Sequence, residues 1–468
     1  MVHDYFVEIF GSSNTNMEVG YLEGITRVSA IQNQNLLRPV TALEVKKAVF
    51  SMHPEKALGP DGFNPGFYQH YWDILGEDIV KFCQHLFTEG RIQTDVNQTN
   101  IVLIPKKGKP ESLSDWRPIA LCNVLYKIFA KVLANRLKGT LEKLVSTNQS
   151  AFVPGRSIID NVMVAFESIH YLKQKRQGKD DFVALKLDMS KAYDRVEWGY
   201  LEAVMKIMAF DQKWINLIME CIGSVEYYIP FDGNMVGPIK PKRGLRQGDP
   251  LSPYLFILVA EGLSAMIRKQ EGLGNIVGIS VARGAPRVSH LFFADDSYLF
   301  FRARDEECQT VKNLLQSYEE VSGQKVNYQK SSVLFSPNLG GDSRTRVSSF
   351  LGVSSEETNP RYLGLQALVG RKKMDILGYL RERILKRIQS WNNKFLSKAG
   401  REIMLKTIIQ AMPTYAMNVF LLPKELCSEI EGIMNGYWWR GSDLSRQGLR
   451  WKSWQSLCYP KQKGGLGF

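Results

Sequence analysis

The sequence predicts an α+β fold built from two or three packed subdomains. Two apolar segments read as strands, Phe182–Leu187 and the run from Leu291 to Phe300, and amphipathic helical patterns lie before, between and after them. Strands interspersed with helices are typical of mixed α and β architectures. A chain of 468 residues is too long for one simple core, so we expect more than one subdomain.

The composition is that of an ordinary globular protein, with 44% hydrophobic and 23% charged residues. The six cysteines are scattered without CxxC spacing and no signal peptide opens the chain, so we expect reduced thiols in an intracellular protein. No apolar run approaches the length of a bilayer crossing, which predicts a soluble protein with no membrane partner.

Positive charge is concentrated in the last quarter of the chain. The net charge is +13, and residues 361–468 contain 19 Lys or Arg and 7 Asp or Glu, an excess of 12. Such an excess either coats a solvated face or binds a polyanion such as a nucleic acid. Charge alone leaves both interpretations open.

The first elements are predicted to be peripheral. Residues 1–37 have mixed polarity and suggest an incomplete element with no chemistry of its own. A helical pattern then runs from Thr41 to Met52, where Thr41 is a suitable N-cap and Glu44 completes a capping box. The helix ends in Lys56–Gly62, a turn-rich loop whose glycines permit positive φ.

A short strand and an amphipathic helix are predicted next. Ile101–Ile104 reads as a short strand that Pro105 ends. Beyond it, Asp115–Ile119 leads into an amphipathic helix, and we expect Lys127 and Arg136 on its outer side.

The next strand carries the first acidic residue of interest. Phe182–Leu187 reads as a buried strand that ends at Asp188. Ser190 is expected to cap a helix in which apolar residues recur at four-residue spacing to Met208.

Two further helices complete the pattern. The glycine and proline loop Arg243–Pro253 opens a hydrophobic helix from about Tyr254 to Ile267. Near the C-terminus, Arg371–Trp391 forms a basic amphipathic pattern, with apolar residues on one side and Arg and Lys around the other.

Two adjacent carboxylates, Asp295 and Asp296, lie inside an otherwise apolar run. A buried carboxylate is normally paired, neutralised or bound to metal, because leaving it unpaired is costly. The flanking residues predict two short strands with the acids at the tip, aimed at a shared cation. An acidic β-turn between core strands is the alternative.

Asp188 and Asp295 are 107 residues apart, so only folding can bring them together. If their strands are neighbours, the carboxylates meet at one edge of the sheet, where two hard cations about 3.5–4 Å apart could bridge them. Mg²⁺ suits this set because it prefers oxygen ligands and shares substrate phosphates. Zinc is disfavoured because the six histidines lack HExxH or similar spacing.

Such a site suits phosphoryl transfer, as in a polymerase or a nuclease. A site for an incoming triphosphate separates the two, and Lys106, Lys107 and Arg117 offer the cations, with Arg117 able to bind phosphate oxygens in bidentate fashion. Taken singly, each of these residues is more readily explained as a surface charge.

Three segments in order, Leu187–Asp194 (LDMSKAYD), Arg246–Pro253 (RQGDPLSP) and Phe293–Asp296 (FADD), resemble motifs A, B and C of reverse transcriptases. Further segments narrow the likeness to the non-LTR retrotransposon type, most similar to the long interspersed elements of plants. These are Lys56–Gly62, Trp116–Ile119, Asn148–Phe152, Gly155–Arg156, Ser322–Asn327, Arg361–Gly364 and Gly464–Phe468. The likeness covers nearly the whole chain.

The resemblance implies a right-hand polymerase with fingers, an antiparallel palm sheet and a helical thumb. Residues 1–40 would be the remnant of a linker before the polymerase, and residues 41–366 the fingers and palm, with their core at 100–366. Residues 367–440 would be the thumb and 441–468 the start of a truncated C-terminal region. The chain would thus be the polymerase module of a larger element, without its endonuclease.

The family also implies a set of site residues. Two Mg²⁺ ions, for which Mn²⁺ can substitute, would be held by Asp188, the main-chain carbonyl of Met189, Asp295 and the less certain Asp296. Tyr193 matches the aromatic steric gate against a ribose 2′-hydroxyl, and its alternative is a core aromatic at a helix start. The nucleotide would be held by Lys106 or Lys107, Arg117, Gln247 and Gly248, the glycine because a side chain would obstruct the base pair.

The remaining implied sites are less specific. Lys330 is preferred over Lys325 as the motif D lysine that protonates pyrophosphate, and an exposed loop lysine is the alternative. The primer grip would be Tyr362, Leu363 and Gly364, although a hairpin without function has the same sequence. On the basic helix, Arg383, Lys386 and Arg387 would contact the phosphates of an RNA/DNA hybrid.

The implied activity is RNA-directed DNA polymerisation, with an RNA template, a DNA primer and dNTP as partners. A silent nucleic-acid-binding protein with the same fold is the second hypothesis, and a viral-type RNA-dependent RNA polymerase, against which Tyr193 argues, is the third. An intact element would act in the nucleus and in cytoplasmic ribonucleoprotein.

Overall fold

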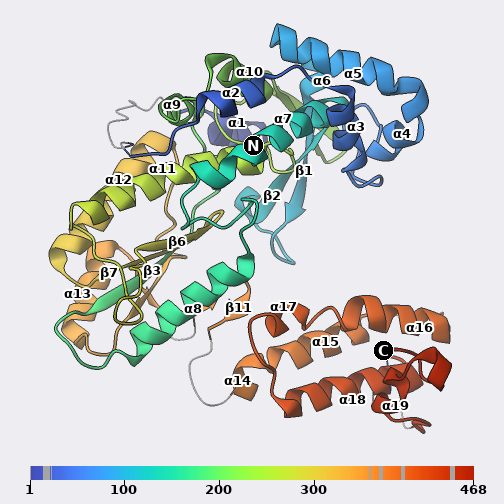
Figure 1. The fold of residues 1–468 in the computed structure, drawn as a ribbon, viewed down its shortest axis with the longest axis vertical. Coiled ribbons are helices and arrows are strands. Elements are labelled where there is room, and N and C mark those ends of the chain that lie inside the picture. Colours follow the sequence, from blue (N-terminus) through green and yellow to red (C-terminus); the bar gives the residue numbers. More distant parts are fainter. Residues whose placement is uncertain are drawn as a thin grey trace. The chain divides into compact units, whose positions relative to one another are not determined.

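The computed structural model describes residues 2–13, 22, 24–357, 360–367, 373–391, 396–442 and 448–468. They form an α+β structure that divides into two compact units (Figure 1). Unit 1 contains Met1–Asn161 and Gln174–Thr358, and unit 2 contains Val162–Lys173 and Asn359–Phe468. None of the described helices is both long enough and apolar enough to span a membrane.

Both sequence segments of unit 1 contribute helices. They are α1 (Val2–Phe10), α2 (Ala30–Leu37), α3 (Ala42–Phe50), α4 (Pro65–His70), α5 (Trp72–Glu89), α6 (Thr94–Asn97), the 3₁₀ turn η2 (Leu113–Asp115), α7 (Val124–Leu144), the start of α8 (Ile158–Gln174), α9 (Trp198–Ile207), α10 (Gln212–Gly223), α11 (Ser252–Gly272), α12 (Asp305–Ser322) and α13 (Gly341–Leu351).

A five-stranded sheet forms the centre of unit 1. Its strands are β3 (Phe182–Leu187), β6 (His290–Phe293), β7 (Asp296–Arg302), β8 (Ser332–Phe335) and β9 (Ser355–Glu356), in the order β6-β7-β3-β8-β9. All neighbours are antiparallel except β8 and β9. The middle strand β3 is almost entirely buried, as expected for an apolar strand with a partner on each side.

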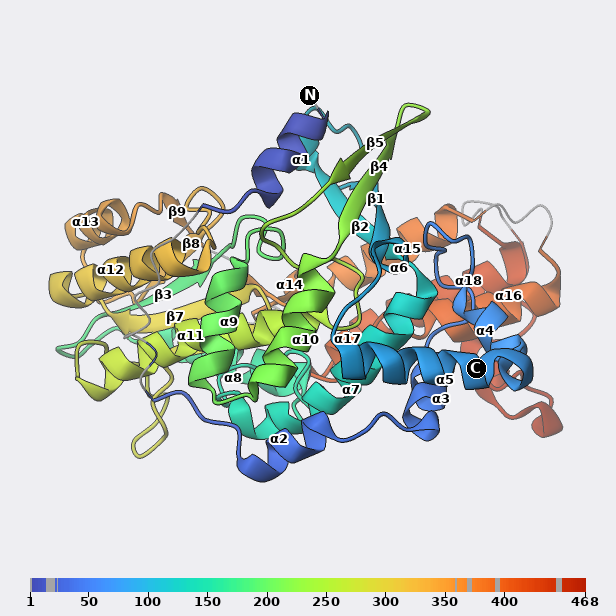
Figure 2. The ribbon, with the colours of Figure 1, turned by 90° about the horizontal axis from the view of Figure 1, so that it is seen from above.

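The second sheet of unit 1 has four strands in the order β2-β1-β4-β5. They are β1 (Gln98–Pro105), β2 (Trp116–Cys122), β4 (Glu226–Phe231) and β5 (Asn234–Ile239). Strands β1 and β2 pair antiparallel up to Pro105 opposite Trp116, so the basic residues that follow β1 lie beside the start of β2. Figure 2 shows α1 next to β5 at one end of this sheet.

Unit 2 is mainly helical. It has a small hairpin of β10 (Arg361–Tyr362) and β11 (Leu365–Gln366). Its helices are most of α8, then α14 (Lys373–Leu377), α15 (Tyr379–Gln389), α16 (Lys398–Met404), the π turn η4 (Leu405–Ile409), α17 (Thr414–Met417), α18 (Lys424–Arg440), α19 (Trp454–Cys458) and the 3₁₀ turn η5 (Lys461–Lys463).

Several sequence predictions of elements are confirmed. Thr41 caps α3 and forms the capping box with Glu44. Strand β3 has the predicted bounds, and β6 and β7 form the predicted hairpin. The single basic helix predicted at 371–391 is divided at Gly378 into α14 and α15, and the start of the prediction, Arg371, lies outside the described residues.

Other expectations of local structure were wrong. Strand β2 was not predicted. The helix expected from Ser190 begins only at Trp198, because the chain first makes a turn with φ +52° at Lys191. Lys127 and Arg136 were expected outside α7 and are buried.

Arg136 is tolerated inside because its charge and donors are satisfied. Its guanidinium donates to the carboxylate of Glu44 at 3.0 and 3.1 Å and to the carbonyls of Leu36, Arg38 and Pro39. A buried arginine with this many partners is a structural tie between α7 and the α2–α3 connection.

Candidate active site

Unit 1 contains a cavity of about 860 Å³ whose walls come from segments far apart in the sequence. Basic and polar residues of the β1–β2 hairpin form one wall, residues after β3 form another, and the loop before α11 and the β6–β7 turn close it. The lining residues are Lys106, Lys107, Ser114, Asp115, Trp116, Arg117, Pro118, Asp188, Met189, Ser190, Lys191, Ala192, Tyr193, Asp194, Arg246, Gln247, Gly248, Pro253, Asp295, Asn327 and Lys330.

Asp188 and Asp295 meet at one edge of the five-stranded sheet. Asp188 directly follows β3, and Asp295 occupies the two-residue turn between β6 and β7. Strands β3 and β7 are antiparallel neighbours with Leu187 opposite Ser297, so the ends that carry the two acids coincide. Partial burial raises the pKa of the Asp188 carboxyl, and the negative charge of Asp295 raises it further.

Asp296 belongs to strand β7 and is not among the residues that line the cavity. It is the first residue of that strand, pairs with Phe293 across the hairpin and is exposed. Desolvation and the neighbouring Asp295 raise its pKa. Asp188 and Asp295 therefore line the cavity, and Asp296 does not.

A loop after α12 holds the backbone on either side of Met189. The Asn327 amide donates to the Asp188 carbonyl at 2.8 Å, and the Ser190 amide donates to the Lys325 carbonyl at 2.8 Å. Of the two lysines considered for motif D, Lys330 lines the cavity and Lys325 does not. The positive charge of Lys330 opposes the rise in the Asp188 pKa.

The basic wall comes from the β1–β2 hairpin. Lys106, Lys107 and Arg117 all line the cavity. Lys107 forms an ion pair with Asp115 at 3.1 Å, whereas Lys106 donates to the Ser114 carbonyl at 2.9 Å. Desolvation and the nearby Lys330 lower the pKa of Lys106, which is the expected effect of gathering several cations around one cavity.

Tyr193 lines the cavity with its ring packed flat on Phe256 of α11. The ring centroids are 4.7 Å apart and the planes differ by 10°. Its main-chain carbonyl accepts from the Leu245 amide at 2.7 Å. Tyr193 is thus both a packed aromatic and a cavity residue, so the two interpretations of its role are compatible.

Gln247 and Gly248 lie against β2. The Ala120 amide donates to the Gln247 carbonyl at 2.8 Å. Gly248 has φ +114°, and a Cβ there would lie 2.9 Å from the Ala120 carbonyl oxygen. The glycine is therefore required by backbone conformation and by the approach of β2, a reason that the sequence did not reveal.

The loop before α11 is anchored by a buried charged cluster. Arg246 forms an ion pair with Asp249 at 2.9 Å, donates to the Cys221 carbonyl at 2.7 Å and to Asn97, and lies 4.1 Å from the Tyr126 ring centroid. The Tyr126 hydroxyl donates to Asp249 at 2.6 Å. These groups satisfy one another's charges and hydrogen bonds. Arg246 therefore serves to hold the loop that carries Gln247.

Two cavity residues were missed as candidates from the sequence, although both belong to the motif that resembles motif A. Asp194 is buried and accepts from the side-chain amide of Gln247 at 3.3 Å, and burial raises its pKa to about 6. Lys191 lies 4.4 Å from the Tyr5 ring centroid and donates to the Tyr5 hydroxyl, and burial lowers its pKa to about 8. Their place inside a quoted motif was the available signal.

The candidates in unit 2 form two separate features. Tyr362 is buried, and the turn of Leu363 and Gly364 joins β10 to β11, with the Leu363 carbonyl accepting from the Tyr415 hydroxyl at 3.0 Å. The Tyr362 side chain is therefore a core group, whereas Gly364 in the turn is exposed.

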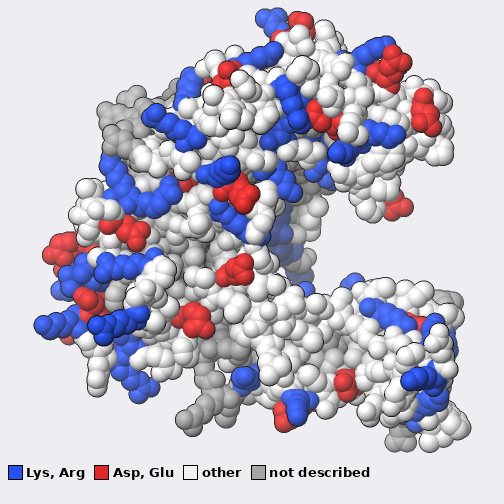
Figure 3. Space-filling view, viewed as in Figure 1, with Lys and Arg blue, Asp and Glu red and all other residues white. Residues whose placement is uncertain are grey.

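Arg383, Lys386 and Arg387 are exposed on α15 and line an open pocket of about 480 Å³, together with Ser390, Ile408 and Met412. Figure 3 shows basic side chains spread over the helices of unit 2 with few acidic ones among them. This distribution follows the charge excess of the sequence.

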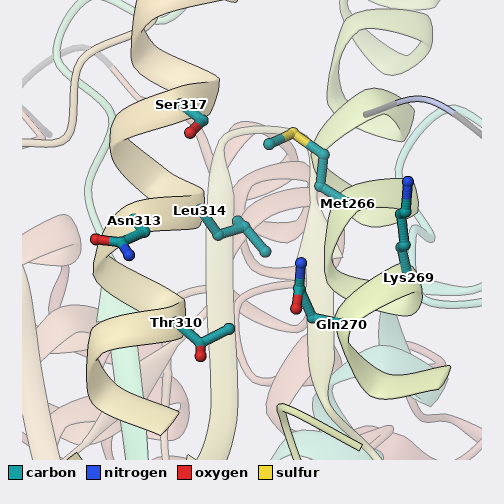
Figure 4. A pocket seen from close by; sticks show the side chains of 7 residues that line it. All are labelled: Met266, Lys269, Gln270, Thr310, Asn313, Leu314 and Ser317. Carbon is teal, nitrogen blue, oxygen red and sulfur yellow. The ribbon is translucent and has the colours of Figure 1, made fainter. Parts of the chain in front are cut away.

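A smaller cavity of about 290 Å³ lies between α11 and α12 (Figure 4). Its lining combines apolar Met266 and Leu314 with the polar or basic side chains Lys269, Gln270, Thr310, Asn313 and Ser317. It has no carboxylate, so it lacks the ligands that a divalent cation needs.

The large cavity fits a divalent cation of the Mg²⁺ class. Among the described residues no three His, Cys, Asp or Glu side chains form a group that could hold a metal ion by themselves, so a cation here would share its ligands with a substrate. Asp188 and Asp295 supply two carboxylates beside a basic wall, and Mg²⁺ is commonly bound by one or two carboxylates together with substrate phosphates.

The sequence matches known proteins over most of its length. Residues 104–379 match the family model for reverse transcriptase (RNA-dependent DNA polymerase). The chain is 29% identical over 454 residues to the "Transposon TX1 uncharacterized 149 kDa protein" of Xenopus laevis, an alignment that covers 95% of this chain and 33% of that protein.

Two further relatives extend the comparison. A "Retrovirus-related Pol polyprotein from type-1 retrotransposable element R2" of Popillia japonica is 26% identical over 319 residues, which cover 68% of this chain and 42% of that protein. An uncharacterized mitochondrial protein of Arabidopsis thaliana is 49% identical over 77 residues, 16% of this chain and 63% of that protein. The chain thus spans less than half the length of the first two relatives.

Proposed function

The chain belongs to the reverse transcriptase family, and from that premise we propose that it is an RNA-directed DNA polymerase that transfers a nucleotide from dNTP to the 3′-hydroxyl of a primer. The predicted relationship to non-LTR retrotransposons is confirmed, and a plant origin stays a prediction. One observation carries the proposal: Asp188 and Asp295 line the same cavity as Lys106 and Arg117.

In this proposal the two units correspond to the parts of a polymerase hand. The five-stranded sheet of unit 1 is the palm, because its edge carries both carboxylates. The β1–β2 hairpin and the helices α3–α5 are the fingers, and the helical unit 2 is the thumb.

Asp188, Asp295 and the Met189 carbonyl would hold two divalent cations, Mg²⁺ or, as a substitute, Mn²⁺. Cations held there would supply positive charge that favours loss of the primer hydroxyl proton and offsets the charge of the leaving pyrophosphate. The acids must be ionised to do so. Lys330 favours ionisation of Asp188, whereas burial and Asp295 oppose it.

The basic wall would bind the triphosphate. Arg117 presents a planar guanidinium suited to two phosphate oxygens, and Lys106 adds a charge from the same hairpin. Lys107, already paired with Asp115, is the weaker candidate. Lys330 Nζ would donate a proton to the leaving pyrophosphate.

Tyr193 would limit the space beside the sugar. Its ring is fixed by stacking on Phe256, so it cannot easily turn away from a 2′-hydroxyl. Gln247 and Gly248 would lie under the base pair, held by the Ala120 contact and the Arg246 cluster.

Arg383, Lys386 and Arg387 would bind the phosphates of the RNA/DNA hybrid without reading its sequence. A protein with this fold and charge but no chemistry is the second candidate function. Primer extension separates the two.

The test is extension of a DNA primer on an RNA template with dNTP and Mg²⁺. Asp188→Asn and Asp295→Asn should each lower the rate by roughly 10³-fold or more, because a neutral amide is a poor ligand for a hard cation. Circular dichroism and the thermal midpoint should match the unchanged protein.

Asp180→Asn is the matched control, since Asp180 is ion-paired to Arg304 at 2.7 Å and precedes β3 at its opposite end. It should extend primers normally. Full extension by Asp188→Asn or Asp295→Asn would contradict the proposal, and salt-sensitive hybrid binding without extension would favour the second candidate.

A further inference from the structure

The turn that carries Asp295 has an unusual backbone. Phe293 pairs with Asp296, so Ala294 and Asp295 form a two-residue hairpin loop. Ala294 has φ +54°, a conformation that two-residue loops require and that glycine usually supplies. An alanine in this place is strained, so something outside the hairpin must hold it.

Gln149 supplies that restraint. It is only 1% exposed, and its side-chain oxygen accepts from the Ala294 amide at 3.1 Å and from the Ala151 amide at 2.9 Å. Its side-chain nitrogen is buried and has no hydrogen-bond partner among the described residues. The carboxamide is therefore kept for its acceptor oxygen, at the cost of an unsatisfied donor.

The segment around Gln149 is itself bound to β6. The Phe292 amide donates to the Asn148 carbonyl at 2.8 Å, and the Ser150 amide donates to the Phe292 carbonyl at 3.1 Å. The Asn148 side chain donates to the His290 carbonyl at 2.8 Å. The segment thus extends the sheet beyond β6, which fixes where Gln149 can reach.

Arg156 holds the other side of this segment. Its guanidinium donates to the carbonyls of Glu142, Val145, Ser146 and Gln149. A chain of contacts consequently runs from Arg156 through Gln149 to the amide next to Asp295. These residues form two of the sequence segments, Asn148–Phe152 and Gly155–Arg156, to which the proposed function gives no role.

We infer that Gln149 is a positioning residue that holds the Ala294–Asp295 turn in the geometry needed to bind a divalent cation, acting through the Ala294 amide. The inference rests on the proposed function for its catalytic consequence. Its structural part, the restraint of the turn, can be measured without catalysis.

Gln149→Met tests the inference, because methionine keeps the length of the side chain and removes the acceptor. In single-turnover extension the maximal rate should fall tenfold or more, and the Mg²⁺ concentration for half-maximal rate should rise severalfold. The Kd for hybrid should change less than twofold. Adding Ala294→Gly should restore the rate to within about threefold, because glycine adopts positive φ without a restraint.

Asn338→Leu is the matched control. The Asn338 side-chain nitrogen donates to the Asp180 carbonyl at 3.2 Å, and its side-chain oxygen has no hydrogen-bond partner in the part of the chain that the structure describes. Asn338 lies at the other end of the sheet, after β8. Asn338→Leu should lower the thermal midpoint by about as much as Gln149→Met does, without changing the Mg²⁺ concentration that gives the half-maximal extension rate.

Two measurements need no activity. Hydrogen exchange of a peptide covering residues 290–300 should be tenfold or more faster in Gln149→Met, and Mn²⁺ binding followed by electron paramagnetic resonance should weaken severalfold. Gln149→Glu, which keeps an acceptor oxygen, should retain slow exchange.

The outcomes separate the two proposals. If the unchanged protein does not extend primers, the proposed function fails while exchange and Mn²⁺ binding still test Gln149. If it extends primers and Gln149→Met matches it in rate, Mg²⁺ dependence and exchange, the inference alone fails. Equal effects of Asn338→Leu, or no rescue by Ala294→Gly, would assign Gln149 to general stability and overturn it.

Discussion

At the scale of single residues, Tyr193 has the clearest consequence for substrate choice. Its ring lines the cavity and stacks on Phe256, so removing it opens space without changing the carboxylates. We expect Tyr193→Ala to raise ribonucleotide incorporation relative to deoxyribonucleotide by roughly 10- to 100-fold, the size of effect for one steric contact in a pocket.

Single-nucleotide extension with rNTP and dNTP measures this ratio. Tyr193→Phe keeps the ring and should keep the discrimination. An unchanged ratio in Tyr193→Ala would remove Tyr193 from the role of gate.

Asp194 makes a prediction about pH. Burial raises its pKa to about 6 from an ordinary value of 3.8, so between these values the folded state holds a proton that the unfolded state has released. The contribution of this group to stability is therefore full below about pH 4 and is lost as the pH rises to about 6, by roughly 3 kcal/mol.

Asp194→Asn removes this titration and keeps an acceptor for Gln247. The free energy of unfolding of the variant, minus that of the unchanged protein, should rise by about 3 kcal/mol between pH 4 and pH 7 in urea titrations. A difference that does not vary with pH would show that folding does not raise the pKa of Asp194.

The sequence predicted part of the site at this scale. Asp188 and Arg117 could be named because a carboxylate suits a hard cation and a guanidinium suits phosphate, whereas Gln247 was named only because its segment resembles motif B. Asp194 and Lys191 lie in a quoted motif but were not named, because their burial and partners such as Tyr5 are set only by the fold. Gly248 was named for a different reason than the close approach of Ala120.

At the scale of elements, the loop before α11 depends on the cluster of Arg246, Asp249 and Tyr126. Arg246→Met should lower the free energy of unfolding by about 3–5 kcal/mol, because it leaves Asp249 buried without its charged partner. It should also slow extension, since Gln247 is the next residue. Tyr126→Phe removes one hydrogen bond and should cost only about 1–2 kcal/mol.

Urea unfolding and primer extension check both variants. If Arg246→Met lowered the free energy of unfolding by less than Tyr126→Phe does, the cluster would not be what anchors the loop.

Elements with strong local signals were predicted, and those set by tertiary contacts were not. The capping box of α3 and the apolar strand β3 are encoded locally. Strand β2 contains Pro118, and proline argues against a strand because it has no amide hydrogen to donate. The strand can form because β2 lies at the edge of its sheet, where it pairs only with β1. The buried Arg136 was unpredictable because its acceptors lie about 100 residues away.

At the scale of the whole molecule, the charge excess of the last quarter makes a prediction about salt. Replacing Arg383, Lys386 and Arg387 together by alanine should weaken hybrid binding and reduce the slope of log affinity against log salt by up to about 3, if each contacts one phosphate.

Binding titrations over a range of salt concentrations measure the slope. Lys81→Ala is the control, because Lys81 is exposed in unit 1 and already paired with Glu77 at 2.8 Å. A slope unchanged by the triple substitution would mean that nucleic acid binds elsewhere.

The order of the central sheet determines when the site can form. Strand β3 pairs with β7 and β8, which follow it by more than 100 residues, so Asp188 is made long before either neighbour exists. Such non-local pairing slows folding and leaves an apolar strand unpaired in the growing chain. During synthesis the end of the sheet that carries Asp188 therefore lacks both neighbouring strands until residues near Phe335 have been made, and a chain cut short before β8 should expose apolar β3 and aggregate more readily than the full chain.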